Sequence, residues 1–165
     1  MIFAAQIFAA PLVLCCHSDF SSCRKKTVRV LDFLFLFRAY TTDLSLLIAM
    51  KDFSIKQHIV ENTLDGNTKG GIYECAVADI LYKKGLKIYF YKNETVKRKI
   101  DFIFQKEGQV FPVEVKSGNS RASSLTWLLK NKKNIPTAFK FADNNFGRTD
   151  DGIITLPLYM AAFVS

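Results

Sequence analysis

The chain has 165 residues, of which 49% are hydrophobic and 13% are aromatic, so it is long enough for one compact domain and too apolar to be disordered throughout. Its 23 Lys and Arg residues outnumber 15 Asp and Glu residues. The formal net charge of +8 indicates an anionic partner, with nucleic acid ahead of an acidic membrane surface, but from net charge alone we favour a merely soluble basic surface.

Residues 1–37 are predicted to be an irregular apolar segment. The runs MIFAAQIFAAPLVLCC and VRVLDFLFLF are short for a membrane-spanning helix, and the segment lacks the positive start of a secretory signal. We interpret it as a truncated or irregular N-terminus. A signal or membrane anchor is the alternative, and we expect no membrane association.

The four cysteines do not form a recognisable zinc or disulfide pattern. No CxxC pair occurs, and three of them (Cys15, Cys16 and Cys23) fall in the irregular segment, with Cys75 standing alone. A reducing, cytoplasmic location is the expectation that fits this usage.

Residues 38–68 are predicted to hold a short helix and a linker. The run TTDLSLLIAM has an N-cap signal at Thr42 or Asp43, followed by apolar residues at helical spacing. Residues 52–69 are polar and end in the turn-rich run DGNTKGG, so we predict a loop there.

Residues 69–165 are predicted to form an α/β domain with a mixed central sheet. A first helix carries Glu74 at the margin of its apolar stripe and stops at Gly85. The order then runs through three strands, a helix and a strand, followed by a strand and a last helical turn, over LKIYFYK, KIDFIFQ, QVFPVEVKS, SSLTWLLKNKKN, TAFKFA and GIITLPLYMAAFV. Pro112 in the third strand favours an edge or a bulge.

The second and third strands form a hairpin that carries unexpected charges. A loop of two residues, Glu107-Gly108, or of four residues pairs Phe104 with Phe111, Phe102 with Val113, and Asp101 with Glu114. Opposed residues share a face, so Asp101, Glu114 and Lys116 would lie together, opposite a face of phenylalanine and valine. A loop of three residues would instead separate the two acids.

Two carboxylates on one face need a neutralising partner. Lys116 can supply part of the charge, and Mg²⁺, which binds one or two carboxylates together with water and phosphate oxygens, can supply the rest. An ordinary surface ion pair between Glu114 and Lys116 is the alternative.

The same residues resemble a known group of proteins. Ile100-Asp101 and Glu114-Val115-Lys116 match the core motif of the PD-(D/E)XK nuclease superfamily. The blocks GGIYECAVADILYKKG, KIDFIF, PVEVKSG and NNFGRTDDGIITLPLYMAAFV, with FRAYTTDLSLLIAM before them, resemble the C-terminal domain of unknown function of bacterial and archaeal AAA-type ATPases over residues 38–165.

The resemblance implies a restriction-endonuclease-like fold and a set of site residues. Asp101 and Glu114 would be metal ligands, Glu74 the helix carboxylate that assists them, and Lys116 the catalytic lysine. Residues 38–68 would be the remnant of a winged-helix connection. No GxxxxGKS/T or GxGxxG loop occurs, so no ATP binding and no ATPase activity are expected.

Our first functional hypothesis is Mg²⁺-dependent hydrolysis of nucleic acid. The basic residues expected to bind its backbone are Lys83, Lys84, Lys97, Arg98 and Lys99. The second hypothesis is a non-catalytic module of the same fold that binds DNA or a protein partner. A third is a membrane-attached protein held by residues 1–37.

Overall fold

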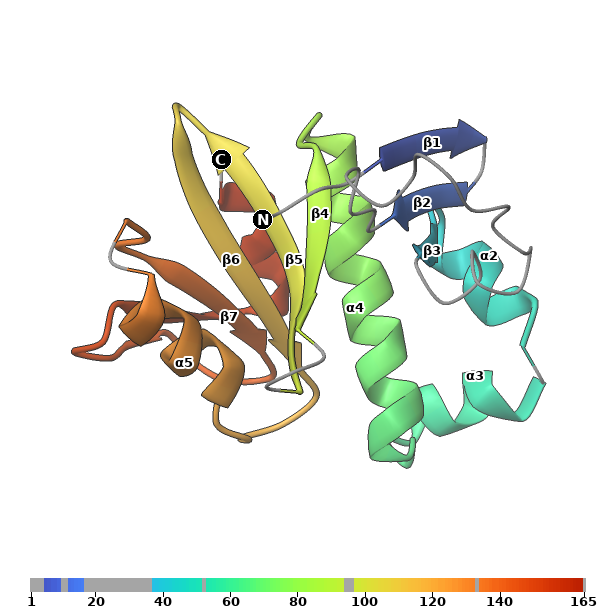
Figure 1. Ribbon diagram of the computed structural model, residues 1–165. Helices are drawn as coiled ribbons and strands as arrows, with labels where there is room; N and C mark the ends of the chain where they lie inside the picture. Colours follow the sequence, from blue (N-terminus) through green and yellow to red (C-terminus); the bar gives the residue numbers. More distant parts are fainter. Residues whose placement is uncertain are drawn as a thin grey trace.

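Figure 1 shows the computed structural model of the chain, which describes residues 5–9, 12–16, 37–51, 53–93, 97–132 and 134–164. A six-stranded mixed sheet lies at its centre, with the strand order β4-β5-β6-β7-β9-β8. The bounds of these strands are β4 Ile88–Asn93, β5 Arg98–Lys106, β6 Gln109–Lys116, β7 Ala138–Ala142, β8 Gly147–Arg148 and β9 Ile153–Pro157.

The sheet is mixed because two antiparallel pairs are followed by two parallel ones. The pairs β4–β5 and β5–β6 are antiparallel, β6–β7 and β7–β9 are parallel, and the short β8 returns antiparallel to β9. The prediction of an α/β domain with the order helix, three strands, helix and strand is confirmed. The two-residue strand β8 was not predicted, because Gly147-Arg148 is too short to show a hydrophobic pattern.

Each face of the sheet is covered by a different helix. The helix α4 (Gly66–Lys83) and the terminal 3-10 helix η1 (Leu158–Phe163) pack on one face, and α5 (Ser123–Asn131) packs on the other (Figure 1). Phe102 and Phe104 are buried in the core on the α4 face, and Ile100 and Ile103 are buried in the core on the α5 face.

The helix α4 begins earlier than predicted, because its first turn is capped. The side chain of Asp65 accepts hydrogen bonds from the backbone N–H groups of Asn67 and Thr68, which would otherwise lack partners. This cap starts a helix within a glycine-rich run that is typical of a turn. At the other end, Gly85 has a φ of 76°, as expected for a helix stop.

The predicted loop over 52–69 is wrong, because α3 (Phe53–Val60) lies within it. Ile55 and Ile59 have helical spacing, but α3 has only eight residues and none of them is buried, so the pattern was too short to reveal it. The preceding helix α2 (Leu44–Ala49) was predicted, and Asp43 is its N-cap.

A small antiparallel sheet precedes these helices. It consists of β1 (Ala5–Ala9), β2 (Leu12–Cys16) and β3 (Phe37–Thr41), so two strands lie within the segment predicted to be irregular. Residues 17–36, including the run VRVLDFLF, lie outside the described residues. The ring of Tyr40 packs against Phe102 at 5.3 Å between centroids, so β3 joins the core of the α4 face. Among the residues that the structure describes, every helix is too short or too polar to cross a bilayer.

The predicted hairpin is present with a two-residue turn. Glu107 and Gly108 both have positive φ values, 50° and 76°, as a type I′ turn requires. Phe102 pairs with Val113 and Phe104 with Phe111, as predicted. Pro112, in contrast, lies in a central strand, and the parallel pairing with β7 begins one residue after it.

Candidate carboxylate and lysine site

A β-bulge in β5 determines how the acidic residues are arranged. Tyr89 pairs with Ile103 and Tyr91 with Ile100, so two steps along β4 match three along β5. The extra residue interrupts the alternation of side chains. As a result, Ile100 packs on the α5 face although Phe102, two residues later, packs on the α4 face.

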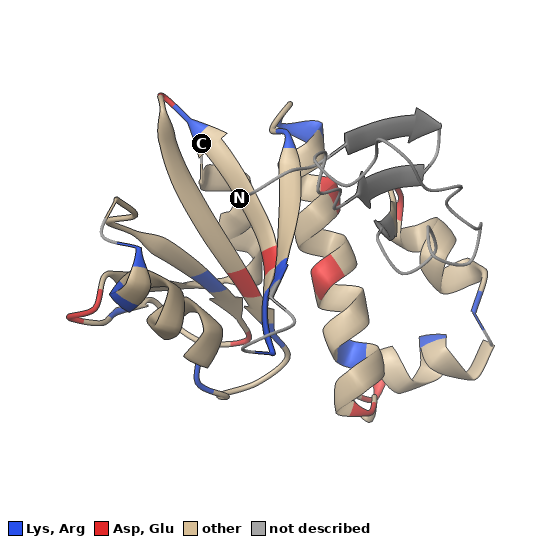
Figure 2. Cartoon of the chain, viewed as in Figure 1, with Lys and Arg blue, Asp and Glu red and all other residues tan. Residues whose placement is uncertain are grey.

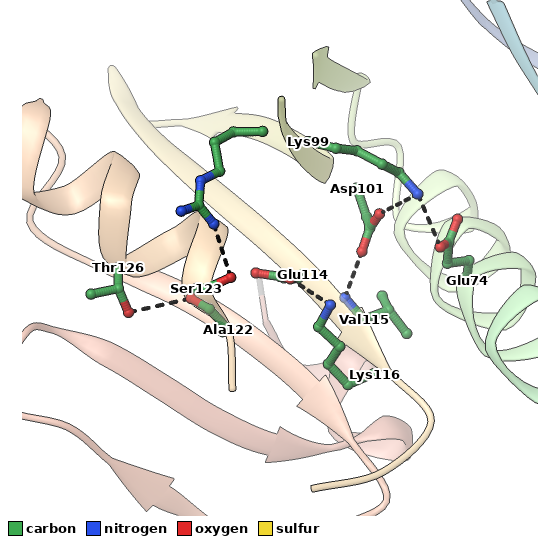
Figure 3. Close-up of polar contacts among 10 residues, drawn as sticks. Glu74, Lys99, Asp101, Glu114, Val115, Lys116, Ala122, Ser123 and Thr126 are labelled. Atoms are coloured by element: carbon green, nitrogen blue, oxygen red, sulfur yellow. Dashed lines mark hydrogen bonds and ion pairs between the residues drawn. The ribbon is translucent and has the colours of Figure 1, made fainter. Parts of the chain in front are cut away.

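The bulge turns Asp101 toward α4. Asp101 is 5% exposed, and its Oδ1 lies 3.1 Å from Nζ of Lys99. The same ammonium lies 3.5 Å from Oε1 of Glu74 on α4, so one lysine lies between two carboxylates (Figure 3). The other oxygen of Asp101, Oδ2, accepts a hydrogen bond of 3.0 Å from the backbone N–H of Val115.

Glu114 faces the opposite side of the sheet. Its neighbours Val113 and Val115 are buried in the core on the α4 face, so regular alternation in β6 directs Glu114 toward α5. The prediction that Asp101 and Glu114 share a face with Lys116 is therefore wrong. The prediction assumed that side chains alternate regularly along β5, and the bulge at Asp101 interrupts this alternation.

Glu114 is a buried acid whose negative charge is only partly balanced by neighbouring groups. It is 4% exposed, its Oε1 lies 2.6 Å from Nζ of Lys116, and its Oε2 has no hydrogen-bond partner among the described residues. Burial raises the pKa of Glu114, against the lowering effect of Lys116; the charge of Asp101 raises it further, and the backbone of Leu125 on α5 lowers it. The two acids are thus close enough to interact although they face different helices.

One further residue near the site was missed. Lys140 on β7 is paired in register with Glu114 and is only 8% exposed. Register neighbours share a face of the sheet, so Lys140 lies beside Glu114 on the α5 side. The signal that could have revealed it was a single lysine inside the otherwise apolar strand run AFKFA.

The predicted basic residues fall in two separate places. Residues 97–99 (Lys, Arg, Lys) lie at the start of β5, beside the acids, whereas Lys83 and Lys84 end α4 (Figure 2). Lys83 there pairs with Asp79 at 2.7 Å, and Lys84 donates to the carbonyl of Ala162 at 2.6 Å. The two groups precede and follow β4 in the chain and so lie near its opposite ends.

Residues 97–99 connect both sides of the site. While Lys99 reaches the acids on the α4 side, Arg98 donates a hydrogen bond of 3.1 Å to Oγ of Ser123, the first residue of α5. The start of β5 therefore links α4 and α5 through polar contacts (Figure 3).

The donors suit a hard cation, but they do not form a complete cage. Among the described residues, no three His, Cys, Asp or Glu side chains lie close enough together to hold a metal ion. Asp101 and Glu74 alone provide two carboxylates, which is enough for Mg²⁺ when water and phosphate oxygens complete the shell. The ammonium of Lys99 already occupies a cation position between them.

A cavity of about 520 Å³ lies beside the same helix carboxylate. It is bounded by β3, α2, α3 and α4, and Glu74 is part of its lining, together with Tyr40, Lys51, Thr68 and Cys75. Glu74 is therefore accessible from the α2 side as well as from Lys99.

Comparison with known proteins gives one match. Residues 69–160 match a family described as a domain of unknown function, DUF4143. No curated protein and no solved structure matches the chain.

Proposed function

We propose that this chain, which belongs to the DUF4143 family of domains of unknown function, binds nucleic acid and hydrolyses its phosphodiester bonds with Mg²⁺. The observation that carries the proposal is that the carboxylates of Asp101 and Glu74 share one cation, the ammonium of Lys99. Two acids that share a lysine ammonium are a pair that can share a divalent cation.

The order of the elements supports a restriction-endonuclease-like fold. Glu74 comes from the helix before the sheet, Asp101 from the second strand of that sheet, and Glu114 and Lys116 from the third. This order agrees with the resemblance to PD-(D/E)XK nucleases. The proposal also includes an unspecified protein partner and, from the cysteine usage, a reducing cytoplasm as the location.

Each residue has a chemical role under this proposal. Asp101 and Glu74 hold the cation, which when bound lowers the pKa of a water molecule and stabilises negative charge on phosphate. Lys116 is the last residue of β6 and is held on the α5 side by its 2.6 Å contact with Glu114, so it reaches a phosphate at the cation around the end of the strand. Lys97 and Arg98 contact the nucleic-acid backbone without reading its sequence.

A non-catalytic module that binds nucleic acid or a protein partner is the second candidate. The observation in its favour is that Glu114 lies on the α5 face, so the two acids of the motif do not converge on one cation. In such a module, the ion pairs of Lys99 and Lys116 would only stabilise the fold.

Cleavage of supercoiled plasmid DNA tests the proposal. We expect cleavage with Mg²⁺ and none with EDTA, and a loss of about a hundredfold or more in Asp101→Asn and Lys116→Ala. Asp150→Asn, an exposed acid in a turn, is the matched control and should keep full activity.

Binding of a fluorescent DNA duplex separates the two candidates. A protein that binds DNA with an affinity that falls as salt rises, but cleaves nothing in Mg²⁺, is the non-catalytic module. Equal cleavage by the wild type, Asp101→Asn and Lys116→Ala would assign the nuclease activity to a contaminant and contradict the proposal.

A further inference from the structure

We infer that Lys99 is an internal counter-ion, which occupies the cation position between Asp101 and Glu74 and has to leave before a divalent cation binds there. This inference rests on the proposed function, since it concerns the same pair of carboxylates. It adds a residue that controls the occupancy of the site.

The contacts of Asp101 show why the two cations compete. Oδ2 of Asp101 already accepts the backbone N–H of Val115, and Oδ1 lies 3.1 Å from the ammonium of Lys99. A divalent cation bound at Oδ1 would therefore compete directly with this ammonium. The ammonium also contacts Glu74 at 3.5 Å, so it covers the second carboxylate as well (Figure 3).

The exposure of the three side chains shows which one can move. The side chain of Lys99 is 46% exposed, whereas those of Asp101 and Glu74 are 7% and 25% exposed. Asp101 is held by a buried backbone contact, while Lys99 has a long flexible stem with solvent on one side. Lys99 is thus the member of the group that can leave without unfolding its surroundings.

Phosphate is the ligand that can draw Lys99 away. Lys99 follows Lys97 and Arg98, so a nucleic-acid backbone bound along this run would meet its ammonium next. Phosphate contact with Lys99 would uncover Oδ1 of Asp101 and Oε1 of Glu74. Binding of the backbone and binding of the cation should therefore strengthen each other.

A purely structural ion pair is the competing explanation. In that case Lys99 would hold the two carboxylates in place, and its removal would let them move apart and leave the affinity of the site for cations unchanged or lower. The two explanations thus differ in the sign of one measurable quantity, the affinity of the metal-free protein for a divalent cation.

Titration with Mn²⁺, followed by the electron paramagnetic resonance signal of the free ion, makes this measurement without any turnover. We expect Lys99→Met, which keeps the aliphatic stem, to bind Mn²⁺ about tenfold more tightly than the wild type, since a positive charge about 3 Å from the site is removed. Lys99→Gln should behave in the same way. It keeps the test intact if the methionine variant folds poorly.

Two control variants separate position from overall charge. Lys99→Arg keeps the charge and should keep the affinity of the wild type. Lys130→Gln removes an exposed charge in the last turn of α5, away from the two carboxylates, and should also change little.

The outcomes separate this inference from the proposed function. If the wild type binds Mn²⁺ and the neutral Lys99 variants bind it equally or less tightly, the counter-ion role is overturned and the proposed cation site stands. If neither the wild type nor the neutral variants bind Mn²⁺, the cation site itself is refuted, and the counter-ion role with it.

Discussion

The two buried acids of the hairpin lie on opposite faces of the same sheet and are stabilised in different ways. Asp101, toward α4, has a partner at each oxygen, the ammonium of Lys99 and the N–H of Val115. Glu114, toward α5, has Lys116 at one oxygen and no hydrogen-bond partner at the other among the described residues.

The difference between the two acids comes from backbone geometry more than from residue type. The paired residues of β5 and β6 end at Phe102 and Val113, and beyond them the Asp101 carboxylate accepts the N–H of Val115. In β6 the alternation is regular, so Glu114 is directed into the core beneath α5. A local irregularity therefore satisfies one buried acid and leaves the other only partly compensated.

Asp101→Ala should have the largest effect on stability. It removes the acceptor of a buried backbone N–H group, which we expect to lower the free energy of unfolding by about 2–3 kcal/mol. Asp101→Asn keeps an acceptor and should lose clearly less. Urea denaturation measures both, and equal losses would show that the contact with Val115 does not stabilise the fold.

Lys116→Met should have the next largest effect, a loss of about 1–2 kcal/mol in the free energy of unfolding, because the buried carboxylate of Glu114 loses its positive partner. Lys99→Met should cost less than about 1 kcal/mol, since the side chain of Lys99 is 46% exposed and Asp101 keeps the Val115 amide. The same denaturation experiment compares them. A larger loss of stability for Lys99→Met than for Lys116→Met would show that the ion pair on the α4 face stabilises the fold more than the one on the α5 face.

Glu114 should also make stability depend on pH. Its pKa in the folded state lies above the ordinary value of 4.5, so the folded protein holds this proton more tightly than the unfolded chain does. The contribution of Glu114 to stability should therefore fall as the pH rises from 4.5 through the raised pKa. In EDTA, the free energy of unfolding of Glu114→Gln should rise relative to that of the wild type over this pH range.

Glu107, an exposed residue in the hairpin turn, offers a control for this pH effect. Glu107→Gln removes an acid that lies outside the core, so its stability should follow the wild type at every pH. A difference between Glu114→Gln and the wild type that stays constant with pH would show that Glu114 titrates normally.

Gly71→Ala should have the smallest effect, a rise of about 0.5–1 kcal/mol in the free energy of unfolding. Gly71 lies in α4 one turn before Glu74, with open space where the Cβ of an alanine would lie, so alanine only reduces the entropy of the unfolded chain. Gly152→Ala is the opposite case, since its Cβ would lie 2.6 Å from the Pro136 carbonyl oxygen. If Gly71→Ala changed the difference in the free energy of unfolding between Lys116→Met and Lys99→Met, the ion pairs on the two faces of the sheet would not be independent.

Much of the fold was predictable because its signals are local. The Glu107-Gly108 turn, the alternation of Phe102, Phe104 and Val113, and the stop at Gly85 each depend on a few neighbouring residues. The helix α3 was missed because its eight residues are too few to show a sustained helical pattern.

The site residues were also predictable as a set, but their arrangement was not. Acids and a lysine inside apolar strands identify Asp101, Glu114 and Lys116, because buried charges are costly and rarely incidental. Lys140 carried the same kind of signal in its own strand. Its place beside Glu114, however, depends on the parallel pairing of β6 and β7.

The sequence by itself therefore determined five strands of the main sheet, the hairpin turn and the identity of the charged residues, all through interactions between residues that are close along the chain. Only the tertiary structure decided which face each acid takes, because the β5 bulge appears in the pairing with β4 and not in the alternation of residue types. It also decided that Lys99 lies between Asp101 and Glu74, since the 25 residues from Glu74 to Lys99 are brought together only by packing α4 against the sheet.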